Sequence, residues 1–243
     1  MLFLNRYYDD VRMDFSVLNS EVRAEFEGAD ISGDIRFMLG EAGTNSLTAE
    51  FERLVMGEPV SDGLYLESSP ADLPALQLFV DSFSNSGDEL VETRIEAFPT
   101  ATGFHFEKVD ASSERLSLQA SGDWTLDEKG ERSTFDIHMA SESLGDFLDS
   151  LDFSSTVQGG QTLVEFNAWW PGSPAAFGLS RLNGQIEFSV VDGNISNASA
   201  GGGRLLGLLS IQALPKRLSL EFRDVFDSGF SFDSASGTFA MEN

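Results

Sequence analysis

The chain has 243 residues, 41% of them hydrophobic and 23% charged, a composition typical of folded proteins and not of disordered ones. It contains no cysteine, which excludes a disulfide framework and any thiolate metal site. The 40 Asp and Glu residues outweigh the 15 Lys and Arg residues and give a formal net charge of −25. Nucleic acid is therefore excluded as a partner, because phosphate binding requires clustered Lys and Arg.

Alternation of apolar and polar residues recurs along the chain and predicts β-strands with one dry face and one wet face. The apolar positions are, in chain order, Met13, Phe15, Val17; Val22, Ala24, Phe26; Ile35, Phe37, Leu39; Leu47, Ala49, Phe51; Leu76, Leu78, Val80; Val91, Thr93, Ile95, Ala97; Leu116, Leu118, Ala120; Phe135, Ile137, Met139; Val164, Phe166, Ala168; Ile186, Phe188, Val190; and Leu218, Leu220, Phe222.

Glycine-containing segments between or beside these runs are predicted to be tight turns, because glycine supplies the positive φ that hairpins require. The segments are Asp62–Gly63, Asn85–Asp88, Gly159–Gly160, Asn183–Gly184 and Asp192–Asn194. Strands joined by short turns form an antiparallel meander. The predicted fold is therefore mainly β, a long curved antiparallel sheet with one apolar face.

Two segments depart from this alternation and predict one or two short helices. Residues 141–151 place Leu144, Phe147 and Leu148 at helical spacing behind Ser and Glu capping candidates. Residues 204–214 are almost entirely apolar and end at a proline, so helix and strand both stay open there. Either segment would suit a lid across the open side of a curved sheet.

Domain boundaries are weakly marked. Residues 56–75 are the loosest stretch, rich in Gly and Pro, yet the alternation resumes after them. We expect 1–243 to be one continuous segment, with 1–69 and 70–243 as the alternative sub-blocks. No run approaches the roughly 18 apolar residues of a membrane helix, and the first residues lack the features of a signal peptide. Any targeting or anchoring part is expected to lie outside this chain.

Catalytic equipment is not recognisable in the sequence. His105 and His138 fall on the polar faces of predicted strands, without the companions that a metal or general-base site needs. Asp123 and Glu165 lie near tryptophans, but among 40 acidic residues such proximity is a weak indication of a glycosidase. The prediction is a non-enzymatic protein with no cofactor and no metal.

The apolar face of such a sheet must be covered. A second sheet covers it in a sandwich, whereas in a lipid carrier bound acyl chains cover part of it. Burying an acyl chain is strongly favourable, at about 0.8 kcal/mol for each CH₂ group. Periodicity alone does not separate these two alternatives.

Several segments of the C-terminal half resemble one protein family. They are Gly122-Asp123-Trp124, residues 141–148, Gly159-Gly160, Trp170–Pro174, residues 203–222 and residues 226–233. The run from Gly203 to Leu218 is the most specific of them. Together they resemble the C-terminal region of the YhdP family, AsmA-like envelope proteins of Gram-negative bacteria, over residues 70–243.

The resemblance implies a repeating β-groove with an apolar interior, in a periplasmic segment of a protein anchored in the inner membrane. It implies phospholipid as ligand, transport between the inner and outer membranes, support of the outer-membrane barrier, and envelope proteins as candidate partners. The candidate groove residues are Leu116, Leu118, Phe135, Ile137, Met139, Val164, Phe166, Ile186, Phe188, Leu218, Leu220 and Phe222. The candidate gate or membrane contact is Leu205, Leu206, Leu208, Leu209 and Ile211. The alternative is a structural or docking β module without a lipid cavity.

Overall fold

A computed structural model describes residues 2–3, 6–41, 44–56, 69–85, 88–128, 130–143, 157–195 and 230–242. Its strands are β1 (Leu2–Phe3), β2 (Arg6–Tyr7), β3 (Arg12–Leu18), β4 (Glu21–Glu27), β5 (Ile31–Met38), β6 (Ser46–Met56), β7 (Ala75–Asn85), β8 (Asp88–Thr100), β9 (Gly103–Ser112), β10 (Leu116–Asp127), β11 (Gly130–Ser141), β12 (Val157–Pro171), β13 (Asn183–Ile195) and β14 (Phe230–Met241). Three 3₁₀ turns, η2 (Pro70–Asp72), η3 (Pro174–Ala176) and η4 (Leu179–Arg181), accompany them.

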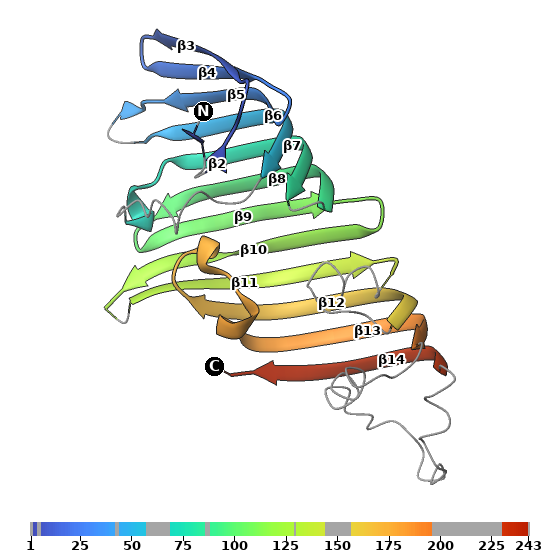
Figure 1. Ribbon diagram of the computed structural model, residues 1–243. Helices are drawn as coiled ribbons and strands as arrows, with labels where there is room; N and C mark the ends of the chain where they lie inside the picture. The colour runs from blue at the N-terminus through green and yellow to red at the C-terminus, as the bar shows by residue number, and fades with distance from the viewer. Residues whose placement is uncertain are drawn as a thin grey trace, which may run out of the picture. The chain divides into compact units, whose positions relative to one another are not determined.

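Twelve of these strands form a single sheet in the order β14-β13-β12-β11-β10-β9-β8-β7-β6-β5-β4-β3, and β1 pairs with β2 in a small separate hairpin. The order ends at β3 and at β14, so the sheet is not closed (Figure 1). The prediction of a mainly β protein built on a long meandering sheet is confirmed.

One strand pair departs from the predicted antiparallel order. β6 and β7 pair in parallel, with Phe51 beside Val80. A parallel pair requires a connection that carries the chain back along the strand, which a two-residue turn cannot do. The long Gly- and Pro-rich connection between Met56 and Ala75 fills this role, and it was the loosest stretch of the sequence.

Among the described residues the turn predictions are confirmed at one site and wrong at three, while the predicted turn at Asp62–Gly63 lies outside them. Asn85 ends β7 and Asp88 begins β8, as predicted. By contrast, Gly159–Gly160 lies inside β12, and Asn183–Gly184 and Asp192–Asn194 lie within β13. Positive φ at Gly159, Gly160, Gly184 and Asp192 therefore bends these strands without ending them.

The predicted helices fall in or next to segments that lie outside the described residues. Those segments are 144–156 and 196–229. Among the described residues, no helix has the length and apolar character needed to cross a membrane.

By their contacts the residues form two compact units. Unit 1 comprises Met1–Ser113, Leu118–Phe135 and Trp169–Gly178, and unit 2 comprises Glu114–Ser117, Asp136–Ala168 and Leu179–Asn243. The expectation of one continuous segment over 1–243 stays a prediction.

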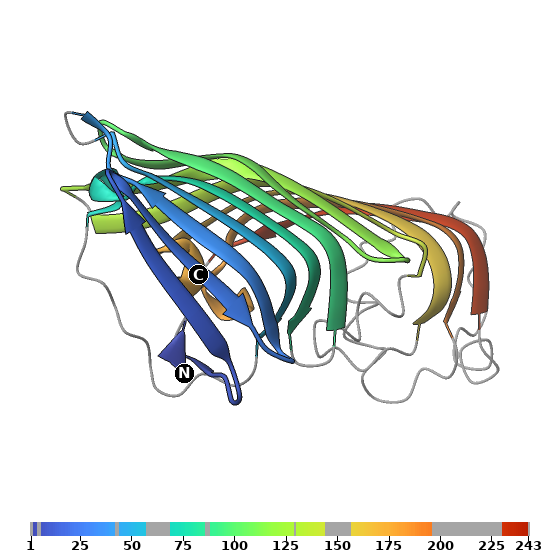
Figure 2. The same cartoon turned by 90° about the horizontal axis from the view of Figure 1, so that it is seen from above.

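In unit 1 the strands bend around a common concave side, on which the β1–β2 hairpin also lies (Figure 2). Buried apolar residues gather there into a core cluster. Its members are Tyr8, Phe26, Ile31, Ala49, Phe51, Leu54 and Val80, with Val11, Ala24, Ile35, Met56, Leu78 and Phe83 packed against them. The face that carries this cluster is called the inward face below.

Local irregularities change which residues reach the inward face. The register between β5 and β6 shifts at Ser32 and Gly33, so that Phe51 and Leu54 are both buried despite their odd and even numbers. In β8 the register to β9 shifts beside Glu92, whose φ is +55°. Val91 is consequently exposed, and its predicted place on the dry face with Ile95 is wrong.

Candidate functional site

Tyr8, in the N-terminal segment, packs into the core of the inward face. Tyr8 is buried in the core cluster, and its hydroxyl lies 3.6 Å from the Sδ atom of Met56. Burial raises the pKa of Tyr8 above its ordinary value of 10.0; the Arg6 charge acts in the opposite direction, and the Asp30 charge adds to the rise. Tyr8 is therefore protonated and uncharged at neutral pH.

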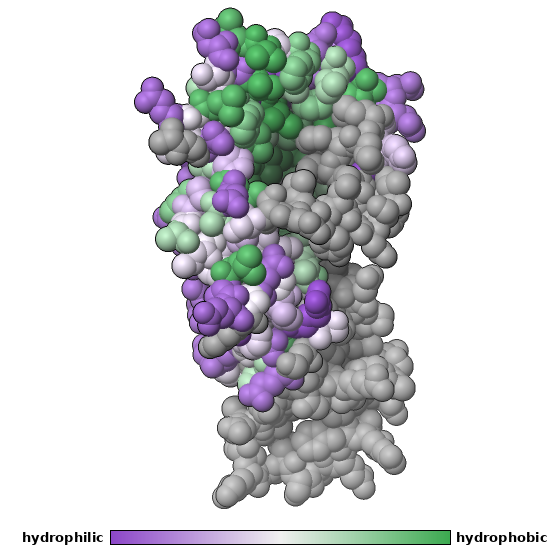
Figure 3. Space-filling view, turned by 90° about the vertical axis from the view of Figure 1, so that its left-hand side faces the viewer, coloured by the Kyte–Doolittle hydropathy of each residue, from purple (hydrophilic) through white to green (hydrophobic). Residues whose placement is uncertain are grey.

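The inward face continues to the free edge of the sheet without losing its apolar character. On β3, Met13, Phe15 and Val17 pair with apolar residues of β4, yet they are 52%, 62% and 63% exposed. The predicted dry face is wrong for this strand, because no strand lies beyond β3 in the described sheet. Figure 3 shows hydrophobic residues gathered in a hollow over the N-terminal strands, with hydrophilic residues around it.

Further along unit 1, rings from β9, β11 and β12 form a continuous series on the inward face. Ring centroids lie 5.4 Å apart for Phe104 and Phe106, 5.3 Å for Phe106 and Phe135, and 5.4 Å for the stacked rings of Phe135 and Trp170. Phe177 completes the series 5.3 Å from Trp170 in an edge-to-face arrangement. These five residues are called the aromatic row.

A glycine makes this row continuous across β10, which lies between β9 and β11. A Cβ atom built on Gly122 would lie 2.7 Å from the ring of Phe135. The missing side chain therefore leaves room for Phe135 to reach over β10 and contact Phe106. Gly122 belongs to one of the sequence segments that resemble the YhdP family.

Aromatic residues on the opposite, outward face of unit 1 have charged or polar partners instead. The guanidinium carbon of Arg94 lies 5.2 Å from the Phe79 ring centre, and that of Arg132 lies 4.4 Å from the Trp169 ring. Phe98 contacts the ring of His105, with centroids 5.2 Å apart. The two faces of unit 1 thus differ in chemistry, since the aromatic rings meet apolar rings inside and charged or polar groups outside.

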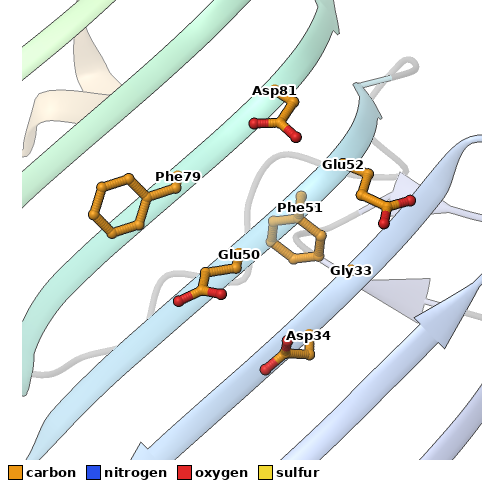
Figure 4. Close-up of a pocket in the computed structure, with 7 residues that line it drawn as sticks. All are labelled: Gly33, Asp34, Glu50, Phe51, Glu52, Phe79 and Asp81. Atoms are coloured by element: carbon orange, nitrogen blue, oxygen red, sulfur yellow. The ribbon is translucent and has the colours of Figure 1, made fainter.

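Charge reinforces this difference. Arg36 contacts Asp34 at 3.1 Å and Glu50 at 2.6 Å across the outward face of β5 and β6. A shallow pocket of about 440 Å³ lies there, lined by Gly33, Asp34, Glu50, Phe51, Glu52, Phe79 and Asp81. Its acidic side chains surround the opening (Figure 4), so it does not suit an acyl chain.

The histidines lie where the alternation predicts. His105 Nδ1 lies 2.8 Å from Asp123 and its Nε2 lies 3.4 Å from Glu107, while His138 lies 3.9 Å from Glu165. No group of three or more metal-binding side chains gathers among the described residues. The Asp123 carboxylate thus has His105 as its partner.

The structure places the predicted groove residues in both units. Phe135 and Phe166 are buried, and the other described candidates, Leu116, Leu118, Ile137, Met139, Val164, Ile186 and Phe188, are half-buried. Leu118 and Phe135 belong to unit 1 and the rest to unit 2. Leu218, Leu220 and Phe222, like the candidate gate Leu205, Leu206, Leu208, Leu209 and Ile211, lie outside the described residues. Contact with lipid stays a prediction for all of them.

Sequence reasoning missed the part of the site that is built by the N-terminal strands. The alternation around Phe51 and Val80 predicts dry faces there, but the candidate groove residues, which rest on the resemblance, all lie between Leu116 and Phe222. Tyr8 and Phe177 carry no periodic signal, because both reach the inward face from segments outside the main strands.

Comparison with known proteins identifies the family of this chain. The model of the family described as YhdP protein matches residues 1–243. This chain belongs to the YhdP family. One relative is the intermembrane phospholipid transporter YhdP of Escherichia coli (strain K12), 28% identical over 131 residues that cover 54% of this chain and 10% of the relative. The chain thus spans a small part of that transporter's length. No solved structure was found to match.

Proposed function

We propose that this member of the YhdP family shields phospholipid acyl chains on its inward face and so supports lipid transport between the inner and outer membranes. The acyl chains lie along the apolar floor of each unit, and the head groups stay in water at its open side. The role is non-enzymatic and belongs to the periplasm, and it helps to maintain the outer-membrane barrier.

One observation supports the proposal above the others: the inward face stays apolar as far as the exposed side chains of β3. An ordinary sandwich covers such a face with a second sheet. Among the described residues the only other sheet is the two-stranded β1–β2 hairpin. Exposed apolar area of this kind is costly in water and is relieved by an apolar ligand.

The chemical difference between the two faces adds a second line of support. The outward face carries ion pairs, acidic residues and cation-covered aromatics, and none of these offers a path for hydrocarbon. The name of the Escherichia coli relative, an intermembrane phospholipid transporter, agrees with the same ligand.

A matched pair of exposed phenylalanines tests the proposal. Phe15 lies on the inward face and Phe98 on the outward face, and both are substantially exposed. Benzoylphenylalanine at either position replaces the phenyl ring by a larger aromatic group that can be photo-crosslinked to a bound ligand. With phosphatidylethanolamine and phosphatidylglycerol vesicles, lipid adducts should form at position 15 and not at position 98.

A second crosslinking position on the inward face shows whether lipid capture is confined to the edge strand β3. Benzoylphenylalanine at Phe106, within the aromatic row, should also capture lipid. Equal adduct yields at positions 15 and 98, or no adduct at positions 15 and 106, would refute lipid shielding. The latter result would favour the alternative, a docking module without a lipid cavity.

A further inference from the structure

The last ring of the aromatic row comes from a short strap, residues 172–178, that follows β12. The strap turns at Gly172, whose φ is +101°. Its base is fixed to β11, because the Gly172 N–H donates to the Glu131 carbonyl at 2.9 Å and the buried Ser133 hydroxyl donates to the Gly172 carbonyl at 2.9 Å. The turn η3 then leads to Phe177, whose N–H donates to the Pro174 carbonyl at 3.1 Å.

The far end of the strap is loosely packed at Gly178, where an added Cβ atom would meet no atom within 4 Å. Phe177 itself is 50% exposed, whereas Trp170 beneath it is only 3% exposed. Phe177 therefore shields part of Trp170 from solvent, whereas half of Phe177 itself is exposed.

Trp170 is held in place by contacts that do not involve Phe177. Its indole N–H donates to the Ser173 carbonyl at 3.0 Å, in the fixed base of the strap, and its ring stacks on Phe135. A tryptophan face offers the same apolar surface to a methylene chain as to a phenyl ring. Loss of the Phe177 contact would uncover this end of the aromatic row.

From this arrangement we propose that Phe177 is a displaceable gate over the aromatic row, and that an acyl chain takes its place on Trp170. The proposal rests on the proposed function, since it assigns a route to the lipid that the inward face shields. The Phe177 ring moves away from Trp170, and the acyl chain packs on Trp170 and Phe135. When the acyl chain dissociates, the hydrogen-bonded base of the strap allows Phe177 to return to Trp170.

The chain has three tryptophans, so Trp170 can be made the sole reporter with Trp124→Phe and Trp169→Phe. Vesicles of phosphatidylethanolamine and phosphatidylglycerol with brominated acyl chains then quench Trp170 when a chain reaches it. Phe177→Ala should raise the quenching constant roughly threefold, as expected for loss of one aromatic contact. The bulkier Phe177→Trp is unsuitable because it adds a fluorophore, so Phe177→Leu serves as the conservative variant and should lie in between.

Phe98→Ala is the matched control, an exposed ring removed from the outward face, and it should leave the quenching unchanged. Circular dichroism and the urea midpoint of each variant confirm that the sheet is intact. Quenching that does not change in Phe177→Ala, while position 15 still captures lipid, would overturn the gate and leave the proposed function standing. Failure of lipid capture at positions 15 and 106 together with no quenching in any variant would overturn both.

Discussion

Phe26 and Phe51 lie on strands that are not neighbours, yet their ring centroids are only 6.2 Å apart. The strand between them, β5, presents Gly33 opposite both residues. The same arrangement recurs in the aromatic row, where Phe135 reaches across Gly122 to Phe106. Glycine in a central strand thus serves here to join aromatic rings two strands apart, at the expense of local strand propensity.

The first prediction concerns Gly33. Its φ is +151°, and an added Cβ would lie 2.8 Å from the Phe51 ring and 2.6 Å from the Phe51 Cα atom. Gly33→Ala should lower the free energy of unfolding by about 3 kcal/mol, through backbone strain and displacement of Phe51. Urea unfolding followed by circular dichroism measures the change.

Gly130→Ala is the control for that experiment. Gly130 also has positive φ, at +110°, but an added Cβ would have nothing within 4 Å. Only the strain of about 1 kcal/mol should remain. Equal losses in the two variants would contradict the account of Gly33 as a site of close packing.

The second prediction is that Phe106 and Phe135 are energetically coupled. A double-mutant cycle with Phe106→Leu and Phe135→Leu should give a coupling free energy of about 1 kcal/mol, because each variant removes the same ring contact. The pair Phe106→Leu and Phe26→Leu, whose rings belong to different clusters, should be additive. If the effects of Phe106→Leu and Phe135→Leu were additive, the two rings would contribute to stability independently, and the predicted coupling would be wrong.

The third prediction uses the raised pKa of Tyr8. The unfolded chain loses the Tyr8 proton near pH 10.0, before the folded chain does, so stability is complete below that pH and decreases as pH rises above it. Between about pH 9 and about pH 11, the urea midpoint should fall more in the wild-type chain than in Tyr8→Phe. An identical fall in both would place the alkaline sensitivity elsewhere.

The fourth prediction concerns the base of the strap. Ser133→Ala removes the buried hydroxyl that donates to the Gly172 carbonyl and should cost about 1 kcal/mol of unfolding free energy. Thr125→Ala removes a long, exposed hydroxyl contact to the Arg132 carbonyl at 3.5 Å and should cost almost nothing. Thermal and urea unfolding compare the two, and a larger loss in Thr125→Ala would argue against a fixed strap base.

Much of the sheet could be predicted from alternation alone, because every second side chain is apolar in a strand that has one dry face. Phe26, Ala49, Phe51 and Val80 were assigned to a dry face in this way, and they are buried. The alternation fails at Val91, because a single positive φ at Glu92 accompanies the register shift there. A backbone irregularity at one residue does not change the alternation of apolar and polar residues in the sequence, so the sequence does not reveal it.

The remaining failures have a different physical origin. The exposure of Phe15 and the burial of Tyr8 depend on which strands stand next to which, and neighbours are a property of the whole sheet. The parallel pairing of β6 with β7 is likewise a property of topology. The Trp170–Pro174 segment was recognised through resemblance, yet its part in positioning Phe177 appears only in three dimensions.

The parallel pair has a consequence for how the chain reaches its native state. β3–β4, β4–β5, β5–β6, β7–β8 and β8–β9 join residues close in sequence, so each can form as soon as its own strands are available. β6 and β7 must instead close a long loop before their first hydrogen bond forms. Folding of unit 1 is therefore expected to begin as two independent meanders, with their union along this single seam as the slow event.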